Sequence, residues 1–475
     1  MPLLPGFCAP SSPTRSGAVS SEKTINMYIE ESPNQKGQFT LYGYPGLLPV
    51  ATLPSGPVRG LYESTLGRVF AVTSTTLFEV FAGWTFMSRG TVPTGTAPVS
   101  MTDDGITLVL SVEGQGLAMP FATNVLAIIP STGPPTFGRV QYLDGRILTN
   151  EPGTRNFWFS DILNATSWPA LNFYAAEARA DLLVTLYVDH RELWLFGTQS
   201  IEIWTSTGES LTPFARASAI FLEQGIAAPW AVHALDNTLF WLGGSPRGDG
   251  PIWTARGYDP QRISTHAVES VLSTVGSVED SIACVARHGG HAWYVLYVPG
   301  LETTWAYDTA LQSWTELAEL MDDGATAPWR CWTHTMAFGE HLWGDRGTGA
   351  LYIWSPGYFF YGDRPIYRER ISAHVRQDQQ PVMYSLFELV VESGVGLDGG
   401  VIPGHDPQVR LSWSDDGGKS YSSPLWRSLG RIGEGRQLVR WRRLGRAKSQ
   451  RCFKVQITDP VPVSILGARV EVGGG

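Results

Sequence analysis

Residues 190–194 read His190-Arg191-Glu192-Leu193-Trp194, a charged corner followed by a strand with bulky apolar side chains. The same unit, a turn and then an apolar or aromatic strand, recurs between residues 57 and 360. The other copies are Leu66-Gly67-Arg68-Val69-Phe70, Asp104-Gly105-Ile106, Asp144-Gly145-Arg146-Ile147-Leu148, Asp236-Asn237-Thr238-Leu239-Phe240, Gly289-Gly290-His291-Ala292-Trp293 and Phe338-Gly339-Glu340-His341-Leu342-Trp343. Counted from Gly67, successive copies begin 38, 40, 46, 46, 53 and 49 residues apart, a spacing typical of β-propeller blades.

A second aromatic strand completes each unit. Residues 303–308 lead through a polar turn to Trp314, as in kelch-type blades, and residues 157–161 lead in the same way to Trp168. Apolar and polar residues alternate with a period of two, which indicates strands with one buried face. We therefore predict an all-β fold with a β-propeller of six or seven blades. A β-sandwich with coincidental spacing is the alternative that the pattern leaves open.

Composition divides the chain into three segments. Residues 1–56 are rich in Pro, Ser and Gly, and we expect an extended N-terminal arm that becomes ordered on a partner surface. Residues 57–360 form the predicted β-propeller, which ends near the Pro356-Gly357 turn. Residues 361–475 are predicted to form a smaller C-terminal β domain.

The periodic segments outside the repeats are few. One helix is expected at residues 266–275, where Val268, Leu272 and Val275 share a face. The N-terminal arm holds one expected strand, at residues 24–29. Strands of the C-terminal domain are expected at residues 366–375, 382–391, 409–413, 438–443 and 452–457.

Charge separates the C-terminal domain from the rest of the chain. The whole chain has a formal net charge of −9. Residues 361–475 carry 17 basic and 12 acidic side chains, a net charge of +5, which leaves −14 for residues 1–360. We therefore expect the acidic propeller and the basic C-terminal domain to face different partners.

Cysteine use and the amino terminus bear on the compartment. Cys8, Cys284, Cys331 and Cys452 are far apart and form no Cys-x-x-Cys motif, so we expect buried free thiols in a reducing compartment. Residues 1–5 lack the basic start of a signal peptide. No stretch approaches the roughly 20 apolar residues that span a bilayer. We expect a soluble protein without an export leader or a membrane anchor.

Two motifs that often carry function are interpreted here as loops. Gly394-x-Gly396-x-x-Gly399 matches a dinucleotide-binding fingerprint, but Pro403 follows and no helix can open to bind a pyrophosphate. The segment from Ser414 through Asp416 and Gly418 to Tyr421 resembles the Asp-box of sialidase propellers, which is a hairpin corner without catalytic residues. The sequence therefore predicts no cofactor site at either motif.

The acidic pairs and the histidines favour turns over catalytic or metal sites. Asp103-Asp104, Asp322-Asp323 and Asp415-Asp416 lie in Gly-flanked turns, whereas a glycosidase needs two carboxylates across a cleft. His288 and His291 have a spacing open to a metal, but Gly289-Gly290 between them indicate a hairpin tip. We predict no catalytic residue and no metal site.

One basic cluster is a functional candidate. It crowds the last predicted hairpin, interleaved with Trp441 and Phe453. Three interpretations remain open: contact with an acidic protein subunit, contact with DNA phosphates, and a solvated hairpin face. The net charge of −9 argues against a dedicated DNA-binding protein. The candidates for a subunit or adaptor contact are Arg436, Arg440, Arg442, Arg443, Arg446, Lys448 and Arg451, with Lys454 beside them.

Several long motifs, in this order, give the chain a family resemblance. They are residues 187–197, Ala228-Pro229 with Leu235-Asp236-Asn237, residues 257–267, residues 411–418 and Trp441-Arg442-Arg443-Leu444-Gly445. With these motifs the chain resembles the packaged-DNA stabilisation proteins of short-tailed bacteriophages, also called tail hub or nozzle proteins. The resemblance covers essentially the whole chain and is densest from about residue 140 onward.

The resemblance implies a structural virion protein of the phage tail, assembled in the bacterial host cytoplasm. It implies a homohexameric ring below the portal and its adaptor that continues the DNA channel and retains the packaged genome. Double-stranded DNA passes without sequence-specific contact, and the ring docks a tail needle or plug and tail spikes or fibres. The family has no catalytic residues. An acidic propeller suits such a conduit, because negative walls repel phosphate.

Two other functions compete with this interpretation. The first is a carbohydrate-binding or glycan-hydrolysing propeller protein, which requires a pocket with convergent carboxylates and exposed aromatic rings. The second is a kelch-like interaction protein, which predicts a monomer that forms no ring.

Overall fold

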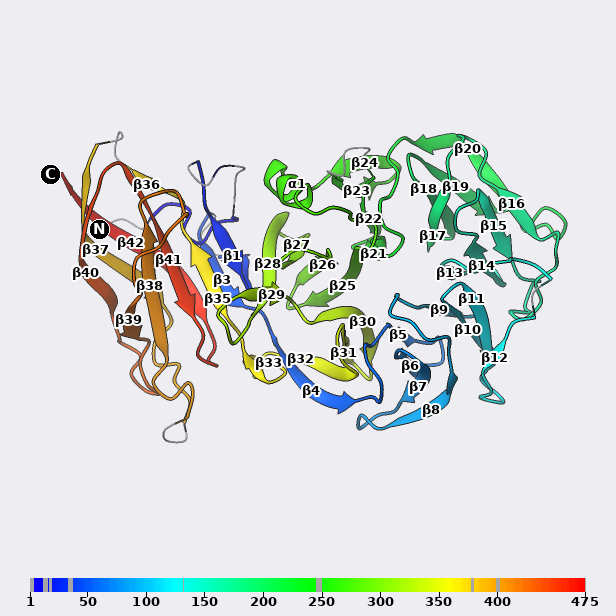
Figure 1. Ribbon diagram of the computed structural model, residues 1–475, viewed down its shortest axis with the longest axis horizontal. Coiled ribbons are helices and arrows are strands. Elements are labelled where there is room, and N and C mark those ends of the chain that lie inside the picture. The colour runs from blue at the N-terminus through cyan, green and yellow to red at the C-terminus, as the bar shows by residue number, and fades with distance from the viewer. Residues whose placement is uncertain are drawn as a thin grey trace. The chain divides into compact units, whose positions relative to one another are not determined.

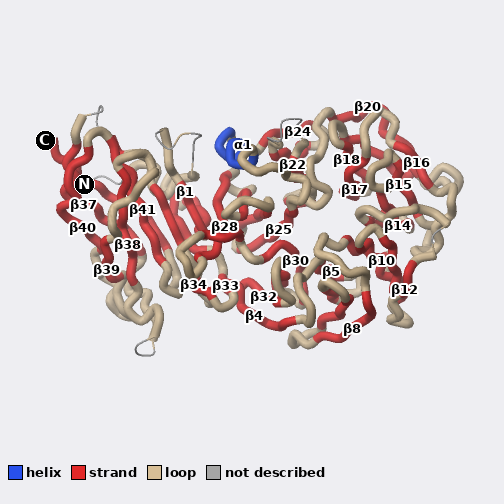
Figure 2. Tube along the Cα trace, in the orientation of Figure 1, coloured by secondary structure: helices blue, strands red, loops and turns tan. Residues whose placement is uncertain are grey.

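The computed structural model describes residues 4–11, 16, 19–32, 37–130, 132–244, 250–376, 380–398 and 402–474. The chain forms two compact units, which we call the propeller unit (residues 49–300 and 330–354) and the sandwich unit (residues 1–48, 301–329 and 355–475). Strands dominate both units, and α1 (His266–Leu272) is the one α-helix among the described residues (Figures 1 and 2). The prediction of an all-β fold is confirmed.

The propeller unit is built from antiparallel sheets that follow one another around a common centre (Figure 1). Five of them have four strands. They are β5 (Gly60–Glu63), β6 (Val69–Val72), β7 (Thr76–Val80) and β8 (Phe86–Thr91); β9 (Ser100–Asp103), β10 (Thr107–Val112), β11 (Gln115–Pro120) and β12 (Ala127–Ile128); β13 (Val140–Leu143), β14 (Arg146–Asn150), β15 (Asn156–Phe159) and β16 (Phe173–Ala175); β17 (Leu183–Asp189), β18 (Glu192–Gly197), β19 (Ile201–Ser206) and β20 (Phe214–Leu222); β21 (His233–Leu235), β22 (Thr238–Leu242), β23 (Ile252–Arg256) and β24 (Asp259–Arg262).

Two further sheet segments complete this unit. One is the hairpin β25 (Ile282–His288) and β26 (His291–Tyr297), and the other contains β30 (Cys331–Ala337), β31 (Glu340–Asp345) and β32 (Ala350–Ser355). Counted over the described residues, the unit holds seven sheet segments, within the predicted range of six or seven blades.

A strand from before the first blade joins the last sheet. β4 (Gly46–Thr52) is the neighbour of β32, and the Leu53 backbone N–H donates a 2.8 Å hydrogen bond to the carbonyl of Gly349. Residues 49–53 of the segment expected as an arm therefore form part of the propeller unit. This closure ties the beginning of the repeat region to its end.

The repeated turns have the backbone that two-residue hairpins require. His190 and Arg191 have φ values of 49° and 64°, and Asp144 and Gly145 have values of 46° and 84°. Positive φ at both central residues matches the right-handed twist of the flanking strands. Aromatic rings fill the space between sheets: Phe157 of β15 lies 5.2 Å from Trp204 of β19, centroid to centroid. Turn chemistry and aromatic packing thus produce the repeat seen in the sequence.

The sandwich unit consists of two packed sheets. The first contains β2 (Met27–Glu31), β3 (Phe39–Gly43), β42 (Ser464–Gly474), β37 (Val382–Val391) and β40 (Val439–Ala447), and the second contains β28 (Ser313–Leu320), β1 (Lys23–Ile25), β35 (Arg368–Ile371), β41 (Gln450–Ile457), β38 (Gln408–Ser414) and β39 (Leu425–Ser428). Phe387 of the first sheet lies 4.7 Å from Phe453 of the second, within one buried core. The sandwich unit also contains the short strands β27 (Thr304–Asp308), β29 (Thr326–Pro328), β33 (Phe360–Tyr361), β34 (Arg364–Pro365) and β36 (Val375–Arg376).

The N-terminal segment packs into the sandwich unit, which differs from the expected extended arm. Phe7 and Cys8 are buried in the core of the unit, and the Leu4 backbone N–H donates a 2.6 Å hydrogen bond to Ala468. Residues 301–329, expected within the propeller, also group with this unit. The division at residues 56 and 360 stays a prediction.

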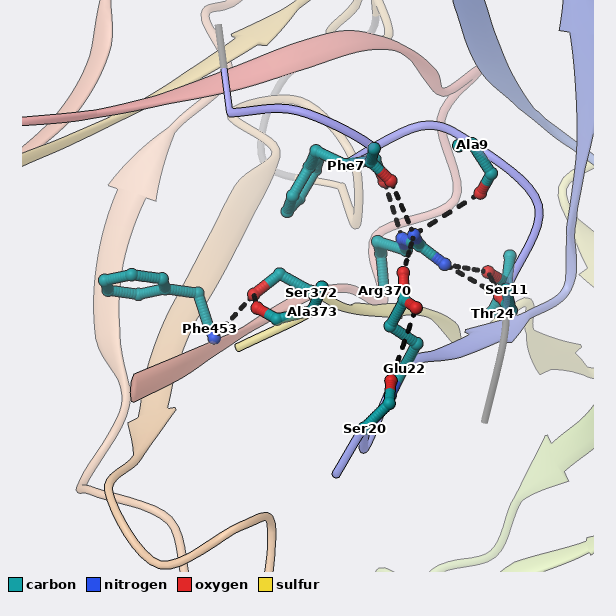
Figure 3. Close-up of polar contacts among 11 residues, drawn as sticks. Phe7, Ala9, Ser11, Ser20, Glu22, Thr24, Arg370, Ser372, Ala373 and Phe453 are labelled. Atoms are coloured by element: carbon teal, nitrogen blue, oxygen red, sulfur yellow. Dashed lines mark hydrogen bonds and ion pairs between the residues drawn. The ribbon is translucent and has the colours of Figure 1, made fainter. Parts of the chain in front are cut away.

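A buried arginine holds the N-terminal segment in place (Figure 3). The Arg370 guanidinium donates to the Phe7 carbonyl at 2.6 Å and to the Ser11 and Thr24 hydroxyls at 2.7 Å, and it pairs with Glu22 at 3.2 Å. Its side chain is fully buried, and this burial lowers the pKa of Arg370. Sequence periodicity gives no signal for such a contact, because 346 residues separate Thr24 from Arg370.

The remaining predicted elements agree with the structure in part. α1 begins at the expected residue, where the Thr265 hydroxyl accepts a hydrogen bond from the Val268 N–H, but it ends at Leu272. The strand expected at residues 366–375 is divided into β35 and β36, and β39 and β42 were not predicted. Among the described residues, no helix is long and apolar enough to cross a membrane.

Candidate protein-interaction surface

Strand β40 presents most of the predicted basic residues on its outer face. Trp441 and Leu444 point into the core, whereas Arg442, Arg443 and Arg446 are exposed. A β-bulge places Arg443 and Leu444 opposite the single residue Ser385, and Arg443 has a φ of 60°. The extra residue keeps the apolar side chains on the inner face and two adjacent arginines on the outer face. Arg436 and Lys448, on either side of β40, are exposed as well.

Arg440 is less available than its neighbours. Its Nε lies 2.5 Å from Oε2 of Glu388, directly across the sheet on β37. Arg469 of β42 pairs with the other oxygen of the same carboxylate at 3.4 Å. Glu388 therefore pairs with two arginines within the sheet, and Arg440 is part of this ion-pair network.

Arg451 is a structural residue, which contradicts its prediction as a contact residue. Its guanidinium makes a two-pronged pair with Asp415 at 2.7 and 2.8 Å and donates to the Leu444 carbonyl at 2.6 Å. The Cζ atom lies 4.6 Å from the Tyr384 ring centroid, and the side chain is only 2% exposed. Asp415 lies 36 positions away in the sequence, so spacing gave no sign of this pairing. Lys454 is likewise occupied, with Nζ 3.8 Å from the Tyr421 ring centroid.

Sequence reasoning missed an apolar part of this surface. Trp426 and Leu438 are 49% and 62% exposed, and Leu425 beside Trp426 is 38% exposed. β39 lies beside β40, because Arg427 Nε donates to the Arg440 carbonyl at 2.9 Å and Trp441 Nε1 donates to the Leu425 carbonyl at 2.9 Å. The available signal was the tryptophan in Pro424-Leu425-Trp426-Arg427, which follows the Asp-box turn.

We define the β39–β40 edge as Leu425, Trp426, Arg427, Leu438, Arg442, Arg443 and Arg446. In the described part of the chain, β39 and β40 are each the last strand of their sheet. Unpaired strand edges are surfaces on which other chains can pair, and exposed tryptophan with arginine is typical of the residues that dominate protein interfaces. Arg410 stabilises the tryptophan, with Cζ 5.1 Å from the ring centroid. The edge thus combines exposed apolar side chains, exposed arginines and two strands that end their sheets.

The Asp-box is a hairpin corner. The Asp416 carboxylate accepts hydrogen bonds from the Lys419 and Ser420 backbone N–H groups at 3.0 and 2.9 Å and from the Ser414 and Ser420 hydroxyls. These donors hold the pKa of Asp416 well below its usual range. The carboxylate is fully committed to the turn.

The other acidic pairs also belong to turns. Asp103 accepts from the Tyr62 hydroxyl at 2.8 Å and the Thr65 N–H at 3.0 Å, and Asp104 accepts from the Thr107 N–H at 2.7 Å. Asp322 pairs with Arg364 at 2.8 Å. Each of these carboxylates stabilises local backbone or a neighbouring cation.

The candidate metal and nucleotide motifs lie in a hairpin and in a loop. His288 and His291 close the β25–β26 hairpin around two glycines of positive φ, and His291 stacks on Trp293 at 5.4 Å. The described residues contain no group of three potential metal ligands. Gly394 and Gly396 lie in a loop after β37, and Gly399 falls outside the described residues.

Two family models match the chain, one for each kind of architecture. The beta-propeller model of bacteriophage P22 Gp10 matches residues 15–356, and the beta-sandwich model of bacteriophage P22 Gp10 matches residues 367–473. The chain belongs to the bacteriophage P22 Gp10 family. The predicted resemblance is thereby confirmed, and the Gp10-family chain is a structural tail protein of the short-tailed phage type.

Solved structures with a similar backbone have low sequence identity to the Gp10-family chain. The N-terminal domain of Nup159 has a TM-score of 0.43 and 10% identity, and covers 70% of this chain and 99% of its own. A chain of a mitotic checkpoint complex has a TM-score of 0.44 and 13% identity, with 65% and 92% covered. The computationally designed Ika8 protein has a TM-score of 0.38 and 11% identity, with 70% and 97% covered. No curated protein matches the chain.

Proposed function

We propose that this Gp10-family protein is a subunit of a homohexameric ring in the phage tail, below the portal and its adaptor. The ring continues the DNA channel and retains the packaged genome until ejection. It docks a tail needle or plug and tail spikes or fibres. Assembly takes place in the host cytoplasm, and the protein acts without catalysis.

The β39–β40 edge is the observation that carries this proposal. A ring needs a heterologous interface, in which one surface of each subunit binds a different surface of the next. The edge supplies exposed arginines beside Trp426 and Leu438, and residues 1–360 supply a net charge of −14. Opposite charges steer association, while the desolvated apolar centre of an interface provides most of the affinity.

The acidic part of the chain suits contact with passing DNA. Negative walls repel phosphate, so the duplex slides without sequence-specific binding. At the centre of the propeller unit, the first strands of six sheet segments surround a cavity of only about 230 Å³, which is too small to admit a DNA duplex. In this proposal the DNA channel lies between subunits, around the axis of the ring.

A charge-reversal pair tests the edge. The variant Arg442→Glu with Arg446→Glu changes two exposed side chains that have no recorded ion pair among the described residues. The matched control is Arg155→Glu with Arg256→Glu, which changes the net charge equally at exposed positions of the propeller unit. Arg440 is left unchanged, because its replacement would remove one of the two arginines that pair with Glu388.

We expect the edge variant to lose ring assembly with the adaptor, measured by sedimentation and particle imaging, and its particles to lose packaged DNA. The control should assemble as the wild type does. A second variant, Trp426→Ala, should weaken assembly without a change in charge. If both edge variants assemble and retain DNA normally, the β39–β40 edge is a solvated surface and the proposed interface is wrong.

A further inference from the structure

The propeller unit contains a small cavity that the proposed tail function does not use. The cavity measures about 230 Å³, and the residues around it come from the first strands of six sheet segments and the loops before them, so it lies at the centre of the unit. Pockets for drug-sized ligands are larger, from about 300 Å³ upward. The space suits a ligand of a few heavy atoms together with water.

The charged side chains around the cavity all belong to basic residue types. The lining includes Arg59, Arg139, His233 and His334, and none of the described lining residues is an aspartate or a glutamate. Arg59 is committed to the fold, because it donates to the Ala97 carbonyl at 2.7 Å and the Pro93 carbonyl at 3.1 Å and pairs with Glu113. The two arginines are therefore the cations of the cavity lining, and the described lining has no acidic side chain of its own.

Among the described residues, Arg139 forms no ion pair with a carboxylate. Its guanidinium donates to the carbonyls of Val232 at 3.1 Å and Pro229 at 3.5 Å. Its Cζ lies 4.8 Å from the Tyr187 ring centroid. Neutral oxygens and an aromatic face stabilise a guanidinium but leave its charge uncompensated, and several of its five N–H groups remain able to donate.

Polar groups surround the same space. The His233 ring lies 6.2 Å from the Tyr187 ring that Arg139 covers, and His233 follows the Val232 carbonyl directly. His334 Nε2 is 3.0 Å from His341 Nδ1, which fixes its orientation. Gln141 uses its amide oxygen to accept from the Val188 N–H at 3.4 Å, so its NH₂ group remains a donor. Burial and the Arg139 charge hold the pKa of His233 low, so its ring is neutral at neutral pH.

We propose that this axial cavity binds a small free oxyanion of the phosphate type. The Arg139 guanidinium is the charged anchor, and the Gln141 amide NH₂ supplies a further hydrogen bond, while the neutral His233 and His334 rings line the same space. A planar guanidinium matches two oxygens of such an anion, and the interaction is strengthened where solvent is scarce. The site is internal to one propeller unit and is independent of ring assembly.

Inorganic phosphate is the probe. The full-length protein is titrated with sodium phosphate and, separately, with sodium chloride and sodium acetate at matched ionic strength, with heat of binding and thermal midpoint as readouts. We expect saturable binding and a rising midpoint with phosphate only. Arg139→Met should weaken phosphate binding about tenfold or more, since it removes the charged donor. Arg191→Met is the matched control, because Arg191 is exposed and pairs with Asp144 on a surface turn.

A variant-free measurement covers the case in which Arg139→Met does not fold. The side-chain ¹⁵N resonances of His233 and His334 in the wild-type protein should shift on addition of phosphate and saturate with the calorimetric isotherm. Absence of saturable phosphate binding, binding by Arg139→Met equal to the wild type, or unchanged histidine resonances would each overturn the proposal. Saturation by acetate in place of phosphate would assign the cavity to carboxylates and overturn it as well.

Discussion

At the scale of single residues, the arginines divide into buried cross-links and exposed side chains. Arg370 and Arg451 have side chains that are 0% and 2% exposed, and each pairs with a carboxylate and with backbone carbonyls. Arg442 and Arg446 on β40 are exposed. The sequence alone does not distinguish a buried arginine from an exposed one, which is why the predicted basic cluster included the buried Arg451.

Replacement of Arg370 should loosen the N-terminal segment. We expect Arg370→Leu to destabilise the protein by about 3–5 kcal/mol, because the buried Phe7 carbonyl would lose its donor and the partly buried Glu22 would lose its cation. Limited proteolysis should then release residues near the amino terminus before the rest of the chain. The control Arg442→Leu removes an exposed arginine and should leave both the unfolding midpoint and the cleavage pattern nearly unchanged. Equal behaviour of the two variants would contradict the role given to Arg370.

Acidification should destabilise the propeller unit through two partly buried histidines. Burial, with Arg139 and His334 nearby, lowers the pKa of His233 from 6.5 to about 3, and burial lowers that of His334 to about 3. Below pH 6.5 the unfolded chain gains protons that the folded chain does not bind, so stability present above pH 6.5 is lost as the pH falls toward 3. Each ring contributes at most about 1.4 kcal/mol per pH unit.

The measurement compares urea unfolding at pH 7 and pH 5 in phosphate-free buffer for the wild type and His233→Gln. His288 and His341 also have lowered pKa values, so the informative quantity is the difference between the two proteins. The variant should lose less stability on acidification. An identical pH dependence in both proteins would show that His233 titrates normally in the folded state.

At the scale of elements, neighbouring hairpin turns of the propeller unit contact one another. Arg191 pairs with Asp144 of the preceding turn, the His190 ring lies 2.7 Å from Asn237 Oδ1 of the following turn, and Arg287 pairs with Asp236. The residues that marked the repeat in the sequence are therefore the residues that link consecutive sheets. Because the residues that repeat in the sequence also make the contacts between neighbouring sheets, the propeller could be predicted from the sequence.

Elements with distant partners were not predictable from the pattern. β4 contains Pro49 and lacks the alternation of a half-buried strand, yet it joins β32, which is about three hundred residues later in the chain. The β39–β40 edge likewise depends on two strands that end different sheets. Periodicity reports which face of a strand is buried but not which distant strand lies beside it.

One glycine tests the closure of the propeller unit. A Cβ atom at Gly349 would lie 2.0 Å from the Leu53 carbonyl oxygen, so Gly349→Ala must displace the closing backbone. We expect a loss of about 1–3 kcal/mol in unfolding free energy, as for other overpacked sites. Gly347→Ala is the control two residues away, where the nearest atom is 3.6 Å from the added Cβ. Tryptophan fluorescence during urea unfolding measures both, and equal midpoints would argue against a tight closure.

At the scale of the whole molecule, the two architectures and their charges point to assembly. The chain belongs to a family of structural phage tail proteins, and its carboxylate pairs serve turns or internal ion pairs. Among the described residues, the β39–β40 edge combines exposed tryptophan, leucine and arginine, and we propose it as an assembly surface. The family could be inferred from sequence motifs, but Trp426 could not be assigned, because its exposure depends on the edge position of β39.

Particle imaging of the purified full-length protein, alone and mixed with the portal-adaptor protein, tests the central claim most directly. We expect closed six-fold rings, at least in the presence of the adaptor, and their loss in the Arg442→Glu and Arg446→Glu double variant but not in the Arg155→Glu and Arg256→Glu control. A wild-type protein that stays monomeric with and without the adaptor would contradict the proposal that the chain works as a ring in the tail.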